Sequence, residues 1–354
     1  MKVLFRADAN SNIGQGHVMR CLSIADALTE AGHFCIFASA DETASLIITQ
    51  RRFDCKILGT DYSDPESETE AIRKVIDEIK PDVIIVDGYY VNQNYLLMLR
   101  GFAPTVYMDD VYTFAYETDM LINYNVYASL EKYEKLYEKE GVKLPKLLLG
   151  PKYVPLRKEF TIRKEKTIPE KAKKIMISVG GADPLHLALA FLEEIISDDV
   201  LYCEYSFNFI LGRMEPDIDI IKQKASDRAN VKVNVNVLNM KDMIEDADLV
   251  ISAAGSTQYE ICACKTPCIS FSMADNQVEG CLKFDEIGAF VSAGDVRNNT
   301  DFVKDLFSKM VSLSKDRDKR EKMSAVSGEL ADGLGASRIA GELEKLVKAP
   351  VDRR

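Results

Sequence analysis

His17 is the residue of this sequence with the clearest capacity for chemistry. It is one of only three histidines among 354 residues and lies in Ile13-Gly14-Gln15-Gly16-His17, between a glycine-rich turn and a helical pattern. A neutral imidazole can take a proton from water near physiological pH. For an isolated histidine, a structural or helix-capping role is the alternative. The flanking Gly14 and Gly16, and the position directly after an expected strand, favour a catalytic base.

Two further glycine-rich turns occur in the second half of the chain. Gly180 and Gly181 follow one apolar run, and Gly255 follows another. Glycine permits close approach of the backbone to a ligand, and the N–H groups at a helix N-terminus bind anions. No turn completes the dinucleotide fingerprint or the phosphate-binding lysine pattern. The recurrence of three turns at equivalent places nevertheless predicts ligand contact.

Acidic residues stand at the expected strand ends of the first half: Asp8, Asp87 and the pair Asp109-Asp110. Asp87 is followed by Gly88 and by two tyrosines, so one strand end carries a carboxylate and two phenols. Adjacent acids such as Asp109-Asp110 can bind a metal ion or a sugar hydroxyl, or they can cap the next helix. The sequence leaves these alternatives open.

In the second half, Glu260 lies one helical turn after Ser256, and Thr257 lies beside them. A carboxylate in this position can accept hydrogen bonds from both hydroxyls of a ribose. Asn276 and Gln277 follow the next strand. They are suited to a sugar contact and equally to plain turn chemistry.

The elements that must position these residues alternate along the chain. Apolar, β-branched runs are separated by helical patterns, which predicts an α/β protein with parallel sheets. The clearest helices are expected at 19–30 and 66–79, and helical patterns close the chain from Thr300 onward. The strands of the first half are expected at 2–8, 34–39, 55–58, 83–87, 105–109 and 120–123, and those of the second half within 174–183, 205–212, 231–237, 248–257 and 267–272.

The composition of the sequence changes near 153–171, where prolines and basic residues indicate a linker. We therefore predict two domains, 1–153 with the catalytic base and 154–354 with the nucleotide site, and the last helix is a candidate for packing back on the first domain. Two doubly wound domains of this kind are expected to face a cleft, with ligands at the carboxyl ends of the strands.

The composition argues against several classes of protein. A net charge of −11 and a pI of about 5.0 argue against a general nucleic-acid binder. No apolar run approaches the ~20 residues of a membrane-spanning helix, and the N-terminal run is typical of a first strand. Cys262, Cys264 and Cys268 lack paired zinc-site spacing and favour core packing. We expect a cytoplasmic protein without a metal, a cofactor, or a membrane or nucleic-acid partner.

The motifs around these residues resemble those of the PseG-type hydrolases of pseudaminic acid biosynthesis. The resemblance begins with RADANSNIGQGHVMRCLSIADAL and continues through IIVDGYY, LLGPKYVPLRKEF, SVGGADP, AAGSTQYE, ADNQ and DGLGASRIA, in this order along nearly the whole chain. It implies the GT-B architecture of two Rossmann-like doubly wound parallel-sheet domains, similar to the lipid-linked sugar transferase of peptidoglycan synthesis. The same motifs also resemble a spore-coat polysaccharide group classed as glycosyltransferases.

The resemblance implies hydrolysis of UDP-2,4-diacetamido-2,4,6-trideoxy-β-L-altropyranose to UDP and the free sugar, with inversion and without a metal. His17 would activate the water that attacks the anomeric carbon. Tyr89 matches the family tyrosine by its spacing from Asp87, with Tyr90 as the alternative. The expected catalytic residues are His17 and Tyr89, the expected substrate contacts are Gly14, Gly16, Arg20, Asp87, Asn276 and Gln277, and the expected UDP contacts are Gly180, Gly181, Gly255, Ser256, Thr257 and Glu260.

Three alternatives stay open at this point. A glycosyltransferase would use the same UDP-sugar site and deliver an acceptor hydroxyl in place of water, although no amphipathic membrane stretch for a lipid acceptor is clear. A related hydrolase would act on another UDP-diacetamido sugar. A non-catalytic nucleotide-sugar binder is disfavoured by the intact His17 and Tyr89. The sequence indicates neither the oligomeric state nor whether the final sugar decorates flagellin or another glycan.

Overall fold

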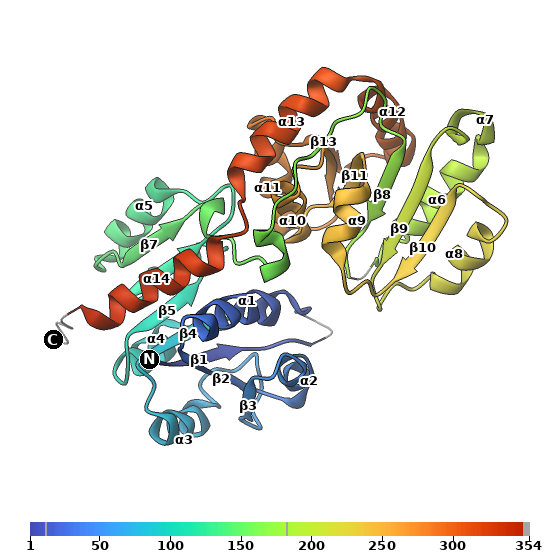
Figure 1. Ribbon diagram of the computed structural model, residues 1–354. Helices are drawn as coiled ribbons and strands as arrows, with labels where there is room; N and C mark the ends of the chain where they lie inside the picture. The colour runs from blue at the N-terminus through green and yellow to red at the C-terminus, as the bar shows by residue number, and fades with distance from the viewer. Residues whose placement is uncertain (11–12, 182, 350–354) are drawn as a thin grey trace. The chain divides into compact units, whose positions relative to one another are not determined.

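The computed structural model describes residues 1–10, 13–181 and 183–349, and the chain divides into two compact units (Figure 1). The first unit contains residues 1–158 and the segment that begins at Gly333, and the second contains residues 159–332. By this division the first unit runs to Lys158, whereas the sequence predicts a boundary at 153/154. The C-terminal helix belongs to the first unit.

A seven-stranded parallel sheet forms the centre of the first unit, in the order β3-β2-β1-β4-β5-β6-β7. Its central strands are apolar on both faces, as expected where helices cover a sheet on both sides. The strands are β1 (Lys2–Ala7), β2 (Phe34–Ser39), β3 (Asp54–Ile57), β4 (Val83–Asp87), β5 (Thr105–Met108), β6 (Met120–Asn123) and β7 (Lys146–Leu149).

Helices cover both faces of this sheet. α3, α4 and α5 bury their apolar stripes against Leu4, Ile84 and Val86. α1 packs against α14, as the ribbon shows (Figure 1). The helices are α1 (Gly16–Glu30), α2 (Glu42–Gln50), α3 (Thr69–Ile79), α4 (Gln93–Arg100), α5 (Leu130–Glu140) and α14 (Gly335–Lys348), with short 3-10 helices η1 (Pro151–Tyr153) and η2 (Lys158–Thr161) at the junction of the units.

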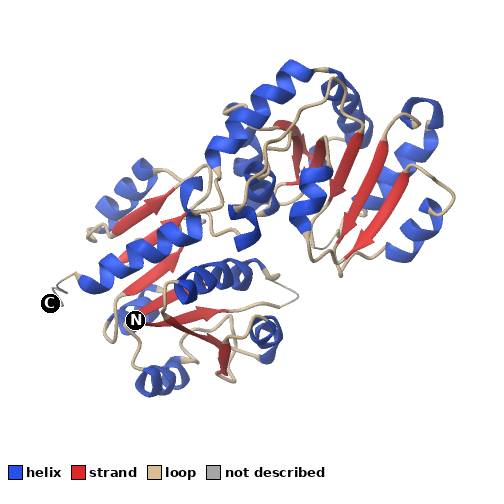
Figure 2. Cartoon of the chain, in the orientation of Figure 1, coloured by secondary structure: helices blue, strands red, loops and turns tan. Residues whose placement is uncertain are grey.

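The second unit repeats this plan with a six-stranded parallel sheet in the order β10-β9-β8-β11-β12-β13. Figure 2 shows its strands flanked by helices. The strands are β8 (Lys174–Ser178), β9 (Ser206–Leu211), β10 (Val231–Val235), β11 (Leu249–Ala253), β12 (Cys268–Ser272) and β13 (Val291–Asp295).

An aromatic core joins α6, α8 and α12 to one face of this second sheet, with Phe191, Phe207 and Phe307 at its centre. On the opposite side, α10 contacts α9 and α13. The helices are α6 (Leu187–Ser197), α7 (Asp199–Tyr202), α8 (Ile218–Ala225), α9 (Met240–Asp246), α10 (Thr257–Ala263), α11 (Asp275–Glu286), η3 (Val296–Asn298), α12 (Phe302–Lys315) and α13 (Arg317–Leu330).

The predicted strands are all present, with ends that differ by a few residues. β7 and β13 were not predicted, because β7 lies in the charged stretch before the linker and the half-buried β13 lacks a strong apolar pattern. Cys262, Cys264 and Cys268 are buried, in agreement with core packing.

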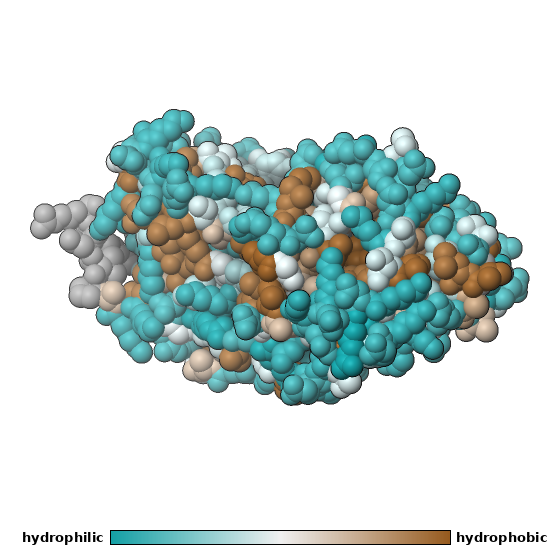
Figure 3. Space-filling model, turned by 90° about the horizontal axis from the view of Figure 1, so that it is seen from above, coloured by the Kyte–Doolittle hydropathy of each residue, from teal (hydrophilic) through white to brown (hydrophobic). Residues whose placement is uncertain are grey.

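The face shown in Figure 3 is mainly hydrophilic, and its apolar residues form separate areas. Within the described part of the chain, no helix combines the length and the apolar character needed to cross a membrane.

Candidate active site

The sheet topology of the first unit brings the predicted catalytic segments together. The strand order reverses between β1 and β4, which pair directly, with Ala7 opposite Asp87. Loops that leave the carboxyl ends of two such strands diverge and leave a crevice between them. The turn that leads to His17 follows β1, and the loop with Tyr89 follows β4, so both segments border the same crevice.

His17 faces the sheet because of its place on α1. The buried residues of this helix include His17, Cys21, Ile24 and Leu28, which recur at helical spacing along one stripe. Arg20 lies one turn after His17 and shares this side of the helix. Gly14, with a φ of 71°, allows the preceding turn.

The imidazole of His17 is paired with a buried carboxylate. Its Nδ1 lies 2.6 Å from Oδ1 of Asp87, and the side chains of His17 and Asp87 are 5% and 0% exposed. From this hydrogen bond we assign the proton of the neutral imidazole to Nδ1, which leaves Nε2 as the proton acceptor. A carboxylate in this position also stabilises the imidazolium that forms when Nε2 takes a proton.

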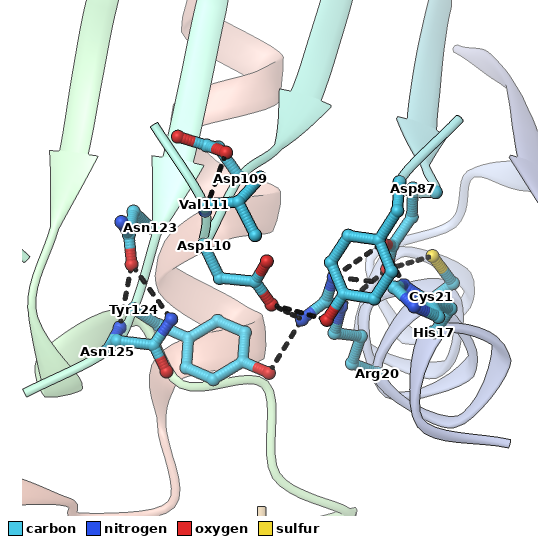
Figure 4. A network of polar contacts seen from close by, with 12 residues as sticks. His17, Arg20, Cys21, Asp87, Asp109, Asp110, Val111, Asn123, Tyr124 and Asn125 are labelled. Atoms are coloured by element: carbon cyan, nitrogen blue, oxygen red, sulfur yellow. Dashed lines mark hydrogen bonds and ion pairs between the residues drawn. The ribbon is translucent and has the colours of Figure 1, made fainter. Parts of the chain in front are cut away.

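Arg20 binds the same Asp87 carboxylate as His17 (Figure 4). Its Nε and Nη2 donate to Oδ2 and Oδ1 of Asp87, each at 2.5 Å, and its Nη1 donates to the hydroxyl of Tyr124 at 3.0 Å. A planar guanidinium suits this two-point contact with a carboxylate. Since its side chain is only 11% exposed and all three nitrogens have partners, Arg20 orients Asp87 here, and a direct substrate contact stays a prediction.

Asp87 was predicted to contact the substrate, and in the structure its carboxylate contacts His17 and Arg20. A substrate contact of Asp87 stays a prediction. The side chain is fully buried and both oxygens are used by His17 and Arg20, so the carboxylate orients the imidazole. Burial alone raises the pKa of Asp87, but the charge of Arg20 and the hydrogen bonds from Arg20 and His17 outweigh it and hold that pKa well below its usual range. Asp87 is therefore ionised at neutral pH.

The two neighbouring tyrosines have different surroundings. The ring of Tyr89 meets that of His17 edge-on, with centroids 4.7 Å apart, while Tyr90 meets Tyr62 in the same manner at 5.4 Å. The Tyr89 hydroxyl donates to Oδ2 of Asp110 at 3.1 Å. Partial burial and the charge of Asp110 raise the pKa of Tyr89, so the phenol keeps its proton. Tyr89 is thus the tyrosine that contacts the imidazole.

Asp109 and Asp110, adjacent in sequence, belong to separate networks (Figure 4). Asp109 is buried and accepts hydrogen bonds from Tyr133 at 2.6 Å and Tyr116 at 2.9 Å, and its contact with the backbone of Val111 is drawn in Figure 4. Asp110 contacts Tyr89 and Arg20 instead. The pair therefore does not act as one chelating unit. Across the described residues, no group of three or more His, Cys, Asp or Glu side chains has the arrangement of a metal site.

A second buried ion pair lies beside His17 and was not predicted. Arg6 Nε donates to Glu68 Oε1 at 2.8 Å, Tyr95 donates to the same carboxylate, and Arg6 also pairs with Asp8 at 2.5 Å. These residues share the wall of a pocket with His17. The signal in the sequence was an arginine inside an otherwise apolar strand.

In the second unit, the two predicted UDP-binding turns are also neighbours. β8 pairs with β11, with Ser178 opposite Ser252, and the strand order reverses between them. The turns at Gly180 and Gly255 follow these strands and so meet at the equivalent crevice. Gly180 has a φ of 104°, a conformation that favours glycine.

The remaining predicted UDP contacts lie in the same region of the fold. Ser256 is the N-cap residue of α10, Thr257 begins the helix, and Glu260 is half-buried one turn later. Gly181 precedes α6 by several residues, and the helix begins at Leu187 after its N-cap residue His186. Contacts of all these residues with UDP stay predictions.

Asn276 and Gln277 belong to the first turn of α11, whereas the sequence suggests a turn at the end of a strand. Asn276 is exposed. Gln277 Oε1 accepts a hydrogen bond from the backbone N–H of Met273 at 2.9 Å, which satisfies a backbone group just before the helix. This hydrogen bond gives Gln277 a local structural role at the start of the helix. A sugar contact of Asn276 or Gln277 stays a prediction.

The chain is similar to three curated proteins, and no protein-family model matches it. It is 29% identical to an uncharacterized protein of Methanocaldococcus jannaschii over 73% of the chain and 53% of that protein. It is 25% identical to the UDP-2,4-diacetamido-2,4,6-trideoxy-beta-L-altropyranose hydrolase of Campylobacter jejuni, over 73% of the chain and 87% of the hydrolase. The spore coat polysaccharide biosynthesis protein SpsG of Bacillus subtilis is 22% identical over 58% of each chain. The chain thus spans about half the length of the archaeal relative.

Solved structures show the fold. MurG of Acinetobacter baumannii superimposes with a TM-score of 0.68 at 15% identity, over 98% of this chain and all of MurG. The calicheamicin glycosyltransferase CalG4 has a TM-score of 0.64 at 13% identity, over 99% of both chains. The predicted fold class is confirmed: the protein has two Rossmann-like parallel-sheet domains that match those of GT-B structures.

Proposed function

We propose that the protein hydrolyses a UDP-linked 2,4-diacetamido-2,4,6-trideoxy-L-altrose to UDP and the free sugar, as a step of pseudaminic acid biosynthesis. The observation that carries the proposal is the pairing of His17 Nδ1 with the buried carboxylate of Asp87, at 2.6 Å. This pairing leaves Nε2 as a base beside Tyr89. The likeness to the Campylobacter jejuni hydrolase, at 25% identity, supports the choice of reaction and substrate.

In the proposed reaction, His17 Nε2 takes a proton from water while the water oxygen forms a bond to the anomeric carbon. The bond between that carbon and the β-phosphate-linked oxygen breaks, and the electron pair leaves with UDP. The configuration at the anomeric carbon inverts. Asp87 stabilises the imidazolium, and the phosphates lie on the glycine-rich turns of the second unit.

The phosphate and ribose contacts are proposed from the sequence and from the sheet topology. Gly180, Gly181 and Gly255 border the crevice between β8 and β11, where backbone N–H groups can hold a diphosphate. Glu260, Ser256 and Thr257 lie at the start of α10 and are proposed to bind the ribose and the phosphates.

The test is release of UDP from the UDP-sugar in buffer with a chelator and without an acceptor. We expect release by the parent protein and its near loss in His17→Ala. His33→Ala is the matched control, because His33 belongs to the same unit but contacts Glu344 at 2.8 Å and not the site. Release that requires an added acceptor would instead identify a glycosyltransferase, and equal release by parent and His17→Ala would remove His17 from the role of base.

A further inference from the structure

We propose that Asp110 is a positioning residue for the reaction at His17, because its carboxylate holds the phenol of Tyr89 against the imidazole. The inference rests on the proposed function, since it concerns the same site. Neither the sequence motifs nor the relatives assign this role.

The geometry around Asp110 points to Tyr89. Oδ2 of Asp110 accepts the hydrogen bond of the Tyr89 hydroxyl at 3.1 Å, and the same oxygen lies 3.4 Å from Nη1 of Arg20. Arg20 is itself held by two contacts with Asp87 and one with Tyr124. The Asp110 oxygen is therefore fixed by a buried cation, and it in turn fixes the phenol.

Tyr89 requires such an anchor. It lies on the loop after β4, and 44% of the residue is exposed, so packing alone constrains its ring weakly. The bond to Asp110 holds the far end of the ring, and the edge of the ring then meets His17 at 83° with centroids 4.7 Å apart. Without the bond, the ring is free to leave the imidazole, and the water that His17 activates loses one wall of its site.

The backbone beside Asp110 is held by hydrogen bonds. The preceding Asp109 is buried and accepts hydrogen bonds from Tyr133 and Tyr116, and from the backbone N–H of Val111 at 3.0 Å. This network holds the turn after β5 on both sides of Asp110. The carboxylate of Asp110 therefore starts from a fixed point at the end of the strand next to β4.

The carboxylate of Asp110 is largely buried, with 15% of its side chain exposed. Its Oδ2 is the oxygen that contacts both Tyr89 and Arg20. The carboxylate is therefore oriented toward these two residues.

The first test is kinetic and uses Asp110→Ala, Asp110→Asn, Tyr89→Phe and the double variant of Tyr89→Phe with Asp110→Ala. We expect Asp110→Ala to lower kcat on the order of 10- to 100-fold with KM nearly unchanged, because misplacement of the site affects the chemical step. Asp110→Asn, which keeps an acceptor oxygen, should recover much of the loss. In the Tyr89→Phe background, Asp110→Ala should lower kcat little further, because the effects of substitutions at two contacting residues do not add.

Full additivity of the two losses, or an unchanged kcat in Asp110→Ala, would overturn the proposal. Asp77→Ala is the matched control, because Asp77 is an exposed carboxylate of the same unit that pairs only at the surface with Lys80. It should leave kcat and KM as they are.

The second test does not depend on turnover. The chain has three histidines, so their imidazole NMR signals can be assigned by substitution. In Asp110→Ala, the His17 signals should shift as the aromatic edge of Tyr89 moves away, while those of His33 and His186 stay in place. Unshifted His17 signals would refute the positioning role. A protein that hydrolyses no UDP-sugar but shows the shift would refute the proposed function and retain the role of Asp110 in holding Tyr89.

Discussion

Replacement of Asp87 by asparagine should destabilise the first unit strongly. The Asp87 carboxylate is 0% exposed and accepts three charge-assisted contacts, from His17 Nδ1 at 2.6 Å and from Arg20 Nε and Nη2 at 2.5 Å each. Asp87→Asn removes the charged partner of the Arg20 cation, which is 11% exposed, and leaves it the more distant carboxylate of Asp110 at 3.4 Å. Removing one partner of a buried pair costs about 3–5 kcal/mol. Asparagine keeps one acceptor oxygen, so we expect about 3 kcal/mol, the lower end of that range.

The assay is calorimetry of the whole chain, because the two units can unfold separately and the protein has no tryptophan to report on either. A loss of about 3 kcal/mol corresponds to a melting temperature lower by roughly 6–12 °C for a unit of this size. The transition of the second unit should not move. Asp77→Asn, at an exposed surface pair, is the control and should change the unfolding free energy by less than about 0.5 kcal/mol.

The pH dependence provides a check on the electrostatic origin of this effect. The pKa of Asp87 is held well below its usual range in the folded protein. Its stabilisation is therefore fully present above the unfolded pKa of about 3.9 and is lost as the pH falls through the folded pKa. The stability difference between parent and Asp87→Asn should persist from pH 7 to about 5 and shrink below about 4.

A difference below about 1 kcal/mol at pH 7 would refute the reasoning, because it would mean that the pair contributes no more than a surface contact. The same variant should also release UDP from the proposed substrate roughly 10²- to 10⁴-fold more slowly, the range of a general base that is no longer oriented. A stability loss with unchanged turnover would separate the structural role of Asp87 from a catalytic one.

Three further predictions concern other parts of the chain. Glu68→Gln should destabilise the first unit by about 3 kcal/mol by calorimetry, because buried Arg6 loses one of its two carboxylate partners and keeps only Asp8. A change under about 1 kcal/mol would contradict this. Gly212→Ala should lower the melting temperature of the second unit and weaken UDP binding, as measured by calorimetric titration. The reason is that the Cβ of the alanine would lie 2.1 Å from the carbonyl oxygen of Gly181, in the Gly180 turn. An unchanged melting temperature and affinity would show that the turn adapts. The hydrogen bond to Asp217 raises the pKa of His186, so NMR titration should place it above about 6.5 and Asp217→Asn should lower it. The His186 contact then stabilises the fold fully below about pH 6.5 and less as the pH rises through the folded pKa.

Much of the fold could be predicted from the sequence because it depends on local patterns. Apolar runs bounded by glycine turns and separated by helical periodicity marked the parallel strands, including β1 and β4. The rule that ligands bind at the carboxyl ends of such strands then selected His17 and Tyr89. β7 and β13 were missed because neither carries a strong apolar signal.

The roles of individual polar residues required the tertiary structure. The partners of His17 and Arg20 lie 70 and 67 residues away at Asp87, and Asp110 lies 90 residues from Arg20. No local pattern records a contact between residues this far apart in the chain. The contact of Asp87 with the imidazole and the complete burial of its side chain could not be inferred from the sequence.

Two α/β domains, with His17 at the start of a helix and Asp87 and Tyr89 at the end of a strand, can be inferred from the sequence, because these properties follow from periodicity and turn chemistry within short windows. Which side chains meet depends on the folded sheet. The pairing of β1 with β4 brings Asp87 to His17, and the adjoining end of β5 brings Asp110 to Tyr89. These contacts follow from strand order, and strand order is set by packing of the whole sheet.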